Sequence, residues 1–245
     1  MTLVWFWAKS IKNAGVVDIF WSYNFPVIAI ILLFLADGFE TRKLLICSMI
    51  LLWGIRLGTH LARRVISHLD EEEGRYAQLR KEWAPIAEKK FFWFFQAQGL
   101  SNVFLAIPFF IITRNTSPKL SVFEYSGILF WIIAIIGETI ADWQLDTFKK
   151  NPLNKGKVCD IGLWHYSRHP NYFFEWLIWV SYFIFALGSP YGFLAMLSPA
   201  IILYLLFKVT GIPATEEQSL RSKGALYTNY QKTTSAFFPW FKMKS

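Results

Sequence analysis

The segment GLWHYSRHPNYFFEW, residues 162–176, places an arginine, two histidines, an asparagine and a glutamate beside a strongly apolar stretch. Arginine offers a bidentate donor geometry that suits phosphate, and an asparagine amide both donates and accepts hydrogen bonds. Asn171 and Glu175 are four residues apart, so both side chains fall on one face of a helix. Groups of these types at the edge of an apolar helix indicate a ligand site.

Two histidines in this segment have a spacing that zinc sites use. His165 and His169 are four residues apart, which places both on one side of a continuous helix. Pro170 interrupts such a helix, and no third ligand is evident in the sequence. We therefore expect no metal site.

Charged residues also occur inside apolar stretches, where each one costs a few kcal/mol unless it is paired or faces a cavity. Glu138 and Asp142 are one helical turn apart, with Gln144 just beyond, but the further Glu and His ligands of a di-metal bundle are absent. We expect these three side chains to line a cavity as acceptors for hydroxyl and amide groups. Arg56 lies well inside another apolar run and is also expected to face a cavity, with snorkelling to the headgroups as the alternative.

The elements that must position these groups are apolar helices. The 245 residues are 54% hydrophobic, 19% aromatic and only 17% charged, and the mean hydropathy is +0.34. About 20 apolar residues span the hydrocarbon of a membrane. Six such runs are present, at residues 16–36, 44–62, 91–112, 123–143, 173–187 and 191–207. The sequence predicts an all-α polytopic membrane helix bundle with six transmembrane helices, or seven.

Lysine and arginine are distributed unevenly between the two ends of the predicted spans. Of the 25 Lys and Arg residues, 20 fall on one side, and the other side has only Arg42, Lys43, Arg114 and Lys119. By the positive-inside rule, both termini are predicted to be cytoplasmic. The net charge of +8 therefore reflects membrane topology, and we expect no nucleic-acid partner.

No internal repeat and no long Gly/Ser linker divides the chain, so we expect one integral membrane domain over residues 1–245. Its cytoplasm-facing site is expected to be built from the loop at residues 144–172, the fifth span and the C-terminal tail. No retrieval signal ends the sequence, which favours a bacterial inner membrane over an endoplasmic reticulum. The sequence does not specify an oligomeric state.

Several stretches carry a resemblance to a known group of membrane enzymes. They are NKGKVCDIGLWHYSRHPNYFFEW at residues 154–176, DIFW at 18–21, LLWGIRLGTHLARR at 51–64, DWQ at 142–144 and YTNYQKTTSAFFPW at 227–240. With these stretches the chain resembles the steroid 5-alpha-reductase C-terminal superfamily, in its branch of unknown function DUF1295. The Arg-His-Pro-x-Tyr core is similar to that of membrane sterol reductases and of isoprenylcysteine carboxyl methyltransferases.

The resemblance implies a helical membrane enzyme whose cytoplasm-facing half binds a large nucleotide cofactor, NADPH in the reductases and S-adenosylmethionine in the methyltransferases. In that setting Lys155 and Arg168 suit phosphates, and Asn171 suits the nicotinamide carboxamide. Glu175 suits the same amide or a ribose hydroxyl. The other expected cofactor contacts are Glu138, Asp142, Gln144, Tyr166, His169, Tyr172, Glu217, Tyr227 and Tyr230.

Different residues of the chain favour the reductase and the methyltransferase chemistry. Asparagine followed four residues later by an acid, as in Asn171 and Glu175, resembles the reductase version of the motif. The superfamily usually has a small residue before that acid, whereas this chain has Phe174, which either narrows the cofactor groove or faces lipid. The pair Glu216 and Glu217 resembles the methyltransferases instead. The reductase is our leading hypothesis, and a methyltransferase acting on a lipid or prenylated substrate is the alternative.

The resulting hypothesis is a membrane-embedded NADPH-dependent reductase of a carbon–carbon double bond in a lipophilic substrate, steroid-like, isoprenoid or fatty. Asp18, if its apolar setting keeps it protonated, would donate a hydrogen bond to the substrate carbonyl. Trp53 stands near the place of the tyrosine that the family uses to polarise that carbonyl, and Arg56 completes the expected catalytic set. A non-enzymatic lipid carrier or channel is a third hypothesis, but it gives no reason for the RHPN motif.

Overall fold

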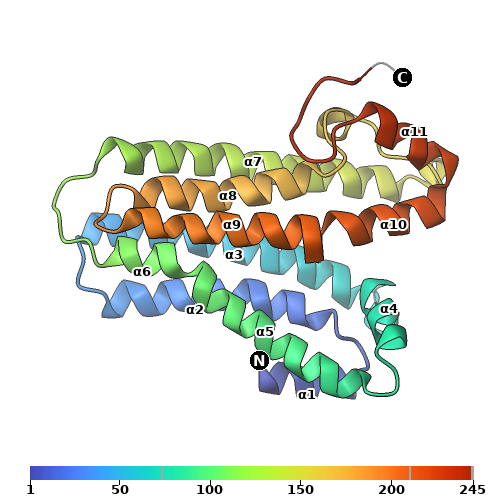
Figure 1. The fold of residues 1–245 in the computed structure, drawn as a ribbon. Helices are drawn as coiled ribbons and strands as arrows, with labels where there is room; N and C mark the ends of the chain where they lie inside the picture. Colours follow the sequence, from blue (N-terminus) through green and yellow to red (C-terminus); the bar gives the residue numbers. More distant parts are fainter. Residues whose placement is uncertain (73, 210, 244–245) are drawn as a thin grey trace. The chain divides into compact units, whose positions relative to one another are not determined.

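The computed structural model describes residues 1–72, 74–209 and 211–243, and every regular element in these ranges is a helix (Figure 1). The all-α prediction is therefore confirmed. The chain divides into two compact units, Met1–Ser121 with Ala186–Leu197, and Val122–Phe185 with the described part of Ser198–Ser245. Each unit is described by itself below, and the single domain expected over residues 1–245 stays a prediction.

The described residues of the first unit form six α-helices and one short 3-10 helix. They are α1 (Thr2–Ser10), α2 (Val16–Leu35), α3 (Glu40–Ile66), α4 (Gly74–Glu82), α5 (Ala87–Leu105), α6 (Ile107–Thr113) and η3 (Gly192–Met196). The second unit contains α7 (Val122–Lys150), η1 (Pro152–Asn154), η2 (Gly162–His165), α8 (Pro170–Ala186), α9 (Leu197–Tyr204), the π-helical turn η4 (Leu205–Val209), α10 (Ile212–Lys223) and α11 (Ala225–Thr233).

Among the described residues, five helical segments are long and apolar enough to cross a membrane. They are Val16–Leu35, Glu40–Ile66, Ala87–Thr113, Val122–Lys150 and Gly192–Lys223. The predicted run at residues 173–187 falls on α8, whose 17 residues extend about 26 Å, somewhat less than the roughly 30 Å of hydrocarbon. The structure is thus compatible with an integral membrane protein and gives five spanning candidates where the sequence predicted six.

Within the first unit, α2 and α3 pack closely because glycines of α3 face bulky groups of α2. A Cβ at Gly54 would lie 2.5 Å from Cδ of Pro26, and one at Gly58 would lie 2.8 Å from the Tyr23 ring. Trp53 is fully buried, with its ring 5.2 Å from that of Phe25. The proline inside α2 is therefore accommodated by a glycine on the neighbouring helix.

Within the second unit, α7 and α8 lie side by side and run antiparallel (Figure 1). Three contacts set the register. A Cβ at Gly127 would lie 2.7 Å from Cβ of Phe185, Trp131 Nε1 donates to the Tyr182 hydroxyl over 3.2 Å, and a Cβ at Gly137 would lie 2.4 Å from the Phe174 ring.

Because the residue numbers in these pairs rise on α7 as they fall on α8, the same register places Glu138 level with Glu175, and Asp142 level with Asn171. Phe174, the residue that departs from the family's usual small one, uses its ring to cover Gly137. It is therefore a packing residue between the two helices rather than a lipid-facing one.

The two glycines of α7 make a prediction about this packing. Gly127→Ala should cost roughly 1–3 kcal/mol, because its new Cβ meets backbone atoms of Phe185 that cannot rotate away. Gly137→Ala should cost less, since the Phe174 ring can move, and the added substitution Phe174→Leu should restore most of the loss. The thermal unfolding midpoint in detergent measures all three, and equal losses for both alanine variants would contradict this register.

Candidate functional site

The loop that precedes α8 is fastened to α7 by backbone and side-chain hydrogen bonds. Gln144 Oε1 accepts from the backbone N–H of Leu163 over 2.9 Å, and Trp164 Nε1 donates to the Ala141 carbonyl over 2.9 Å. Gly162 has a φ of +55°, and the Gln144 amide lies directly against it, so a Cβ has no room there. Gln144, expected to contact a cofactor, instead holds this loop in place.

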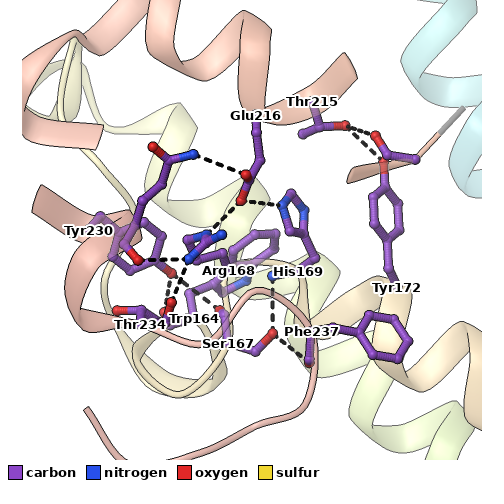
Figure 2. A network of polar contacts seen from close by, with 12 residues as sticks. Trp164, Ser167, Arg168, His169, Tyr172, Thr215, Glu216, Tyr230, Thr234 and Phe237 are labelled. Carbon is purple, nitrogen blue, oxygen red and sulfur yellow. Dashed lines mark hydrogen bonds and ion pairs between the residues drawn. The ribbon is translucent and has the colours of Figure 1, made fainter. Parts of the chain in front are cut away.

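Arg168 is the centre of a buried polar network that joins three segments of the second unit (Figure 2). Its side chain is only 11% exposed, and its Nε donates to Glu216 Oε1 over 2.6 Å. The Nη1 atom donates to the carbonyls of Gln231 and Thr234, at 2.9 and 2.6 Å. Two of its three nitrogens thus donate to protein acceptors, and the phosphate-binding role expected for Arg168 stays a prediction.

Glu216 of α10 uses both carboxylate oxygens in the same network. Its Oε1 lies 3.3 Å from His169 Nε2 as well as accepting from Arg168, and its Oε2 accepts from Gln231 Nε2 over 3.0 Å. Its neighbour Glu217 is exposed and pairs with Arg221 along the helix surface. Because adjacent helical residues point in different directions, only one acid of the pair faces inward, and it is Glu216 rather than the expected Glu217.

The C-terminal tail is fixed to the Arg-His-Pro segment by further hydrogen bonds. Tyr230 donates to the Trp164 carbonyl and lies 3.2 Å from the Ser167 carbonyl, and burial raises the pKa of its phenol. Ser167 Oγ donates to the Phe237 carbonyl over 2.8 Å, and the backbone N–H of Arg168 donates to the Ser235 carbonyl over 2.8 Å. These contacts lock the tail against the start of α8.

His169 and Tyr172 form the side of the network that leads into α8. His169 is 2% exposed, and its ring stacks on that of Tyr172 at 5.3 Å with an interplanar angle of 5°. The Tyr172 hydroxyl lies 3.1 Å from Thr215 Oγ1, which donates to the Gly211 carbonyl. Burial lowers the pKa of His169, and the hydrogen bond and charge of the nearby Glu216 carboxylate only partly offset this effect.

The inner side of α8 carries one unusual group. The Oδ1 atom of Asn171 is buried and has no hydrogen-bond partner within the described residues. Glu175, one turn later, accepts from Trp179 Nε1 over 2.9 Å. Glu138 and Asp142, level with these two residues by the helix register, are 3% and 8% exposed. This end of the α7/α8 interface therefore combines buried carboxyl groups with an amide oxygen that lacks a donor.

The remaining expected cofactor residues lie at the edge of this network or outside it. Lys155 is exposed in the loop before η2, and Tyr166 is 41% exposed beside the Phe241 ring. Tyr227 is 4% exposed and packs against Tyr230, and burial raises the pKa of its phenol to about 12.

The expected catalytic residues all belong to the first unit. Asp18 does not have the apolar setting predicted for it, because it accepts from Tyr76 over 2.8 Å and pairs with Arg75 over 3.2 Å. Trp53 is buried in the α2/α3 packing, and Arg56 is half-buried in the apolar part of α3. An ion pair holds Asp18 as a structural acceptor, so we do not carry its carbonyl-donor role forward.

Sequence reasoning did not anticipate the partners of Arg168. Gln231 and Thr234 contribute backbone carbonyls, for which side-chain type gives no signal. Ser167 was also overlooked, although a serine whose Oγ accepts from the backbone N–H two residues later, here that of His169, is a typical turn residue.

The comparisons with known proteins point to one family. The model of the family described as "Protein of unknown function (DUF1295)" matches residues 4–234. An uncharacterized protein of Schizosaccharomyces pombe, C594.04c, is 24% identical over 95% of this chain and 75% of its own length. A protein of Ustilaginoidea virens named probable O-methyltransferase ustE is 33% identical over 38% of this chain and 31% of its own length. No solved structure matches the chain.

The glutamate pair gives a matched test of the network. Glu216→Gln should cost about 3–5 kcal/mol, because it leaves the Arg168 guanidinium buried without its counter-charge. Glu217→Gln changes the same side chain on the exposed surface and should cost under about 1 kcal/mol. Thermal unfolding and limited proteolysis of the C-terminal tail measure the two effects, and similar behaviour of the two variants would rule out the network as the element that fixes the tail.

The lowered pKa of His169 predicts a pH dependence of stability. The unfolded chain takes up a proton on this histidine near its ordinary pKa of about 6.5, and the folded chain does so only at lower pH. The stabilisation is therefore complete above about pH 6.5 and is lost as the pH falls. His169→Gln should flatten the stability profile between about pH 5 and 7; if the profiles of the variant and the original protein stay parallel, His169 is not the titrating group.

Proposed function

We propose a membrane-bound enzyme activity for this chain, which belongs to the DUF1295 family, part of the steroid 5-alpha-reductase-like group. The proposed reaction is the NADPH-dependent reduction of a carbon–carbon double bond in a lipophilic substrate, steroid-like, isoprenoid or fatty. The proposed cofactor site is the part of the second unit where α7, α8 and α10 carry the buried polar groups described above.

The observation that carries this proposal is the unpartnered Oδ1 of Asn171. A buried acceptor without a donor costs about 1–3 kcal/mol, so its presence is best explained by a ligand that supplies the donor. A carboxamide N–H is such a donor, and nicotinamide carries one. When bound, the reduced nicotinamide supplies the hydride, and Asn171 fixes the orientation of the ring through the amide.

Other residues fit parts of the same ligand. Glu138, Asp142 and Glu175 place carboxyl groups near Asn171 by the helix register, where they can accept from hydroxyl and amide groups and offset positive charge on an oxidised ring. Since Arg168 is occupied by Glu216, we assign the phosphates to exposed lysines of the preceding loop, Lys155 and Lys157. His169 and Tyr172 hold the start of α8 rather than contact the reacting atoms.

The proposed topology has six spanning helices, α8 among them, with both termini cytoplasmic. The burial of two cations supports this orientation in addition to the count of Lys and Arg residues. Arg42 and Lys43, on the sparsely charged side, are 1% and 7% exposed and donate to backbone carbonyls of the neighbouring loops. The exposed positive charge on that side is therefore smaller than the sequence suggests, which strengthens the asymmetry that the positive-inside rule uses.

The substrate is expected to reach the site from the bilayer, since the helices are apolar on their exposed sides. Arg56, half-buried in α3, and the buried Trp53 stay proposed substrate residues on the sequence resemblance alone. The family relative in Schizosaccharomyces pombe is a eukaryotic protein, so we propose a membrane location without restricting it to a bacterial inner membrane.

A second candidate function is transfer of a methyl group from S-adenosylmethionine. The observation that favours it is the partial similarity to a protein named probable O-methyltransferase, together with the inward-facing Glu216 next to Glu217. An ammonium or amino group of that cofactor would equally supply a donor to Asn171, and its positive charge suits the buried carboxyl groups. The two functions differ in which cofactor stabilises the protein.

The cofactor test uses the detergent-purified protein and both ligands. At a concentration about 100 times its Kd, a ligand stabilises the fold by about 2.7 kcal/mol, and we expect NADPH to raise the unfolding midpoint while S-adenosylmethionine has little effect. The reverse preference would support the second candidate and overturn the first. No shift with either ligand would contradict a nucleotide cofactor altogether.

Asn171→Leu makes the same test specific to one residue. The ligand-free variant should be as stable as the original protein or more so, because an unpartnered buried amide oxygen has been removed. The shift with NADPH should disappear. Asn229→Ala, at an exposed asparagine of α11, is the control and should retain the full shift.

A further inference from the structure

A cavity of about 580 Å³ lies in the first unit, where the end of α6 meets the segment before η3. Its apolar walls are Phe110, Ile111, Pro190 and Tyr191. Its size is within the range of small-molecule sites, about 300–1,000 Å³. None of its residues belongs to the proposed cofactor site.

The two loops that form this cavity are held rigidly by buried side chains. Asn115 is 7% exposed, and its Nδ2 donates to the Gly188 carbonyl over 3.1 Å and to Ser189 Oγ over 3.0 Å. Arg42, 1% exposed, donates to the carbonyls of Asn115 and Ser117, both at 2.8 Å. The walls are therefore formed before any ligand arrives, which lowers the entropy cost of binding.

The charged side chain that lines the cavity is positive. Arg114 lines it and is exposed, and its guanidinium has no hydrogen bond or ion pair within residues 1–72, 74–209 and 211–243. No acidic side chain lines the cavity, and Thr116 adds an exposed hydroxyl. A free guanidinium beside a hydroxyl suits a phosphate group. A ligand ammonium, by contrast, would find no carboxylate to pair with.

The position of Arg114 at the end of an apolar helical segment places the cavity at membrane headgroup depth. Arg114 directly follows Ala87–Thr113, one of the five segments able to span a membrane. Phe110, one helical turn earlier, is 45% exposed, so the apolar side of α6 leads directly to the arginine. This order of apolar surface followed by a cation matches the order of acyl chain and phosphate in a phospholipid.

Tyr191 completes the wall at a conformational cost. It is 72% exposed and has a φ of +60°, in the left-handed region that bulky residues rarely adopt. Glycine would occupy this position without strain, so the phenol ring needs another reason to be present. An aromatic ring with a hydroxyl at the membrane interface packs on lipid and bonds to a headgroup at the same time.

We propose that this cavity binds the headgroup of an anionic phospholipid. The phosphate pairs with the Arg114 guanidinium and accepts from the Thr116 hydroxyl. Tyr191 and Pro190 cover the glycerol region, and the acyl chains lie along the exposed apolar side of α6.

Native mass spectrometry of the delipidated protein in detergent tests this site. Phosphatidylglycerol should be retained more strongly than phosphatidylcholine, and Arg114→Gln should weaken it about tenfold, as expected for the loss of a charge-assisted hydrogen bond. Lys119→Gln changes an exposed cation outside the cavity and should leave retention unchanged. Equal retention of both lipids, or equal effects of the two substitutions, would reduce Arg114 to a general interfacial anchor and overturn the proposal.

Two further measurements separate the alternatives. Inorganic phosphate at millimolar concentration should not displace phosphatidylglycerol, and displacement would show a free-anion site instead of a lipid site. Tyr191→Gly relieves the left-handed backbone, so the unfolding midpoint should not fall while lipid retention does. Full lipid retention in this variant would show that the ring takes no part and would contradict the proposed mode of binding.

Discussion

A single buried cation, Arg168, organises the second unit. Its guanidinium neutralises Glu216 and donates to the carbonyls of Gln231 and Thr234, which are end groups of α11 and have no partner within that helix. A positive charge at this place is also favoured by the helix dipole. Removing two charges from water is costly, and the cost is offset here by the ion pair and by the hydrogen bonds that Arg168 and Glu216 make to Gln231, Thr234 and His169. The network therefore fixes α10, α11 and the start of α8 together.

In the proposed function, the network positions the cofactor site and does not itself contact the cofactor. Arg168 and His169 both interact with Glu216. Asn171, the next non-proline residue along the chain, instead has a buried amide oxygen without a donor among the described residues. Antiparallel packing through Gly127 and Gly137 then brings carboxyl groups of α7 level with it. A rigid frame that holds an unsatisfied amide oxygen is an arrangement expected where binding energy is reserved for a ligand.

Much of this could be predicted from sequence, and the failures have identifiable causes. Apolar run length predicts helices well, so the all-α fold and the apolar spans at the start of the chain are reproduced. The ion pairs of Arg168 and Asp18 were not predicted, because residue type shows what a side chain can bind and not which partner the fold gives it. Phe174 looked anomalous because its complement, Gly137, lies 37 positions away on another helix. A motif within one segment contains no information about such tertiary contacts.

Hydrogen–deuterium exchange of the detergent-purified protein, with and without NADPH, tests the central claim most directly, because it locates the ligand without assuming a substrate. The account predicts slower exchange of backbone amides in residues 162–175 and in α10 and α11, with residues 107–121 unchanged. Protection confined to other helices, or no protection at a concentration that stabilises the protein, would contradict a cofactor site built around Asn171.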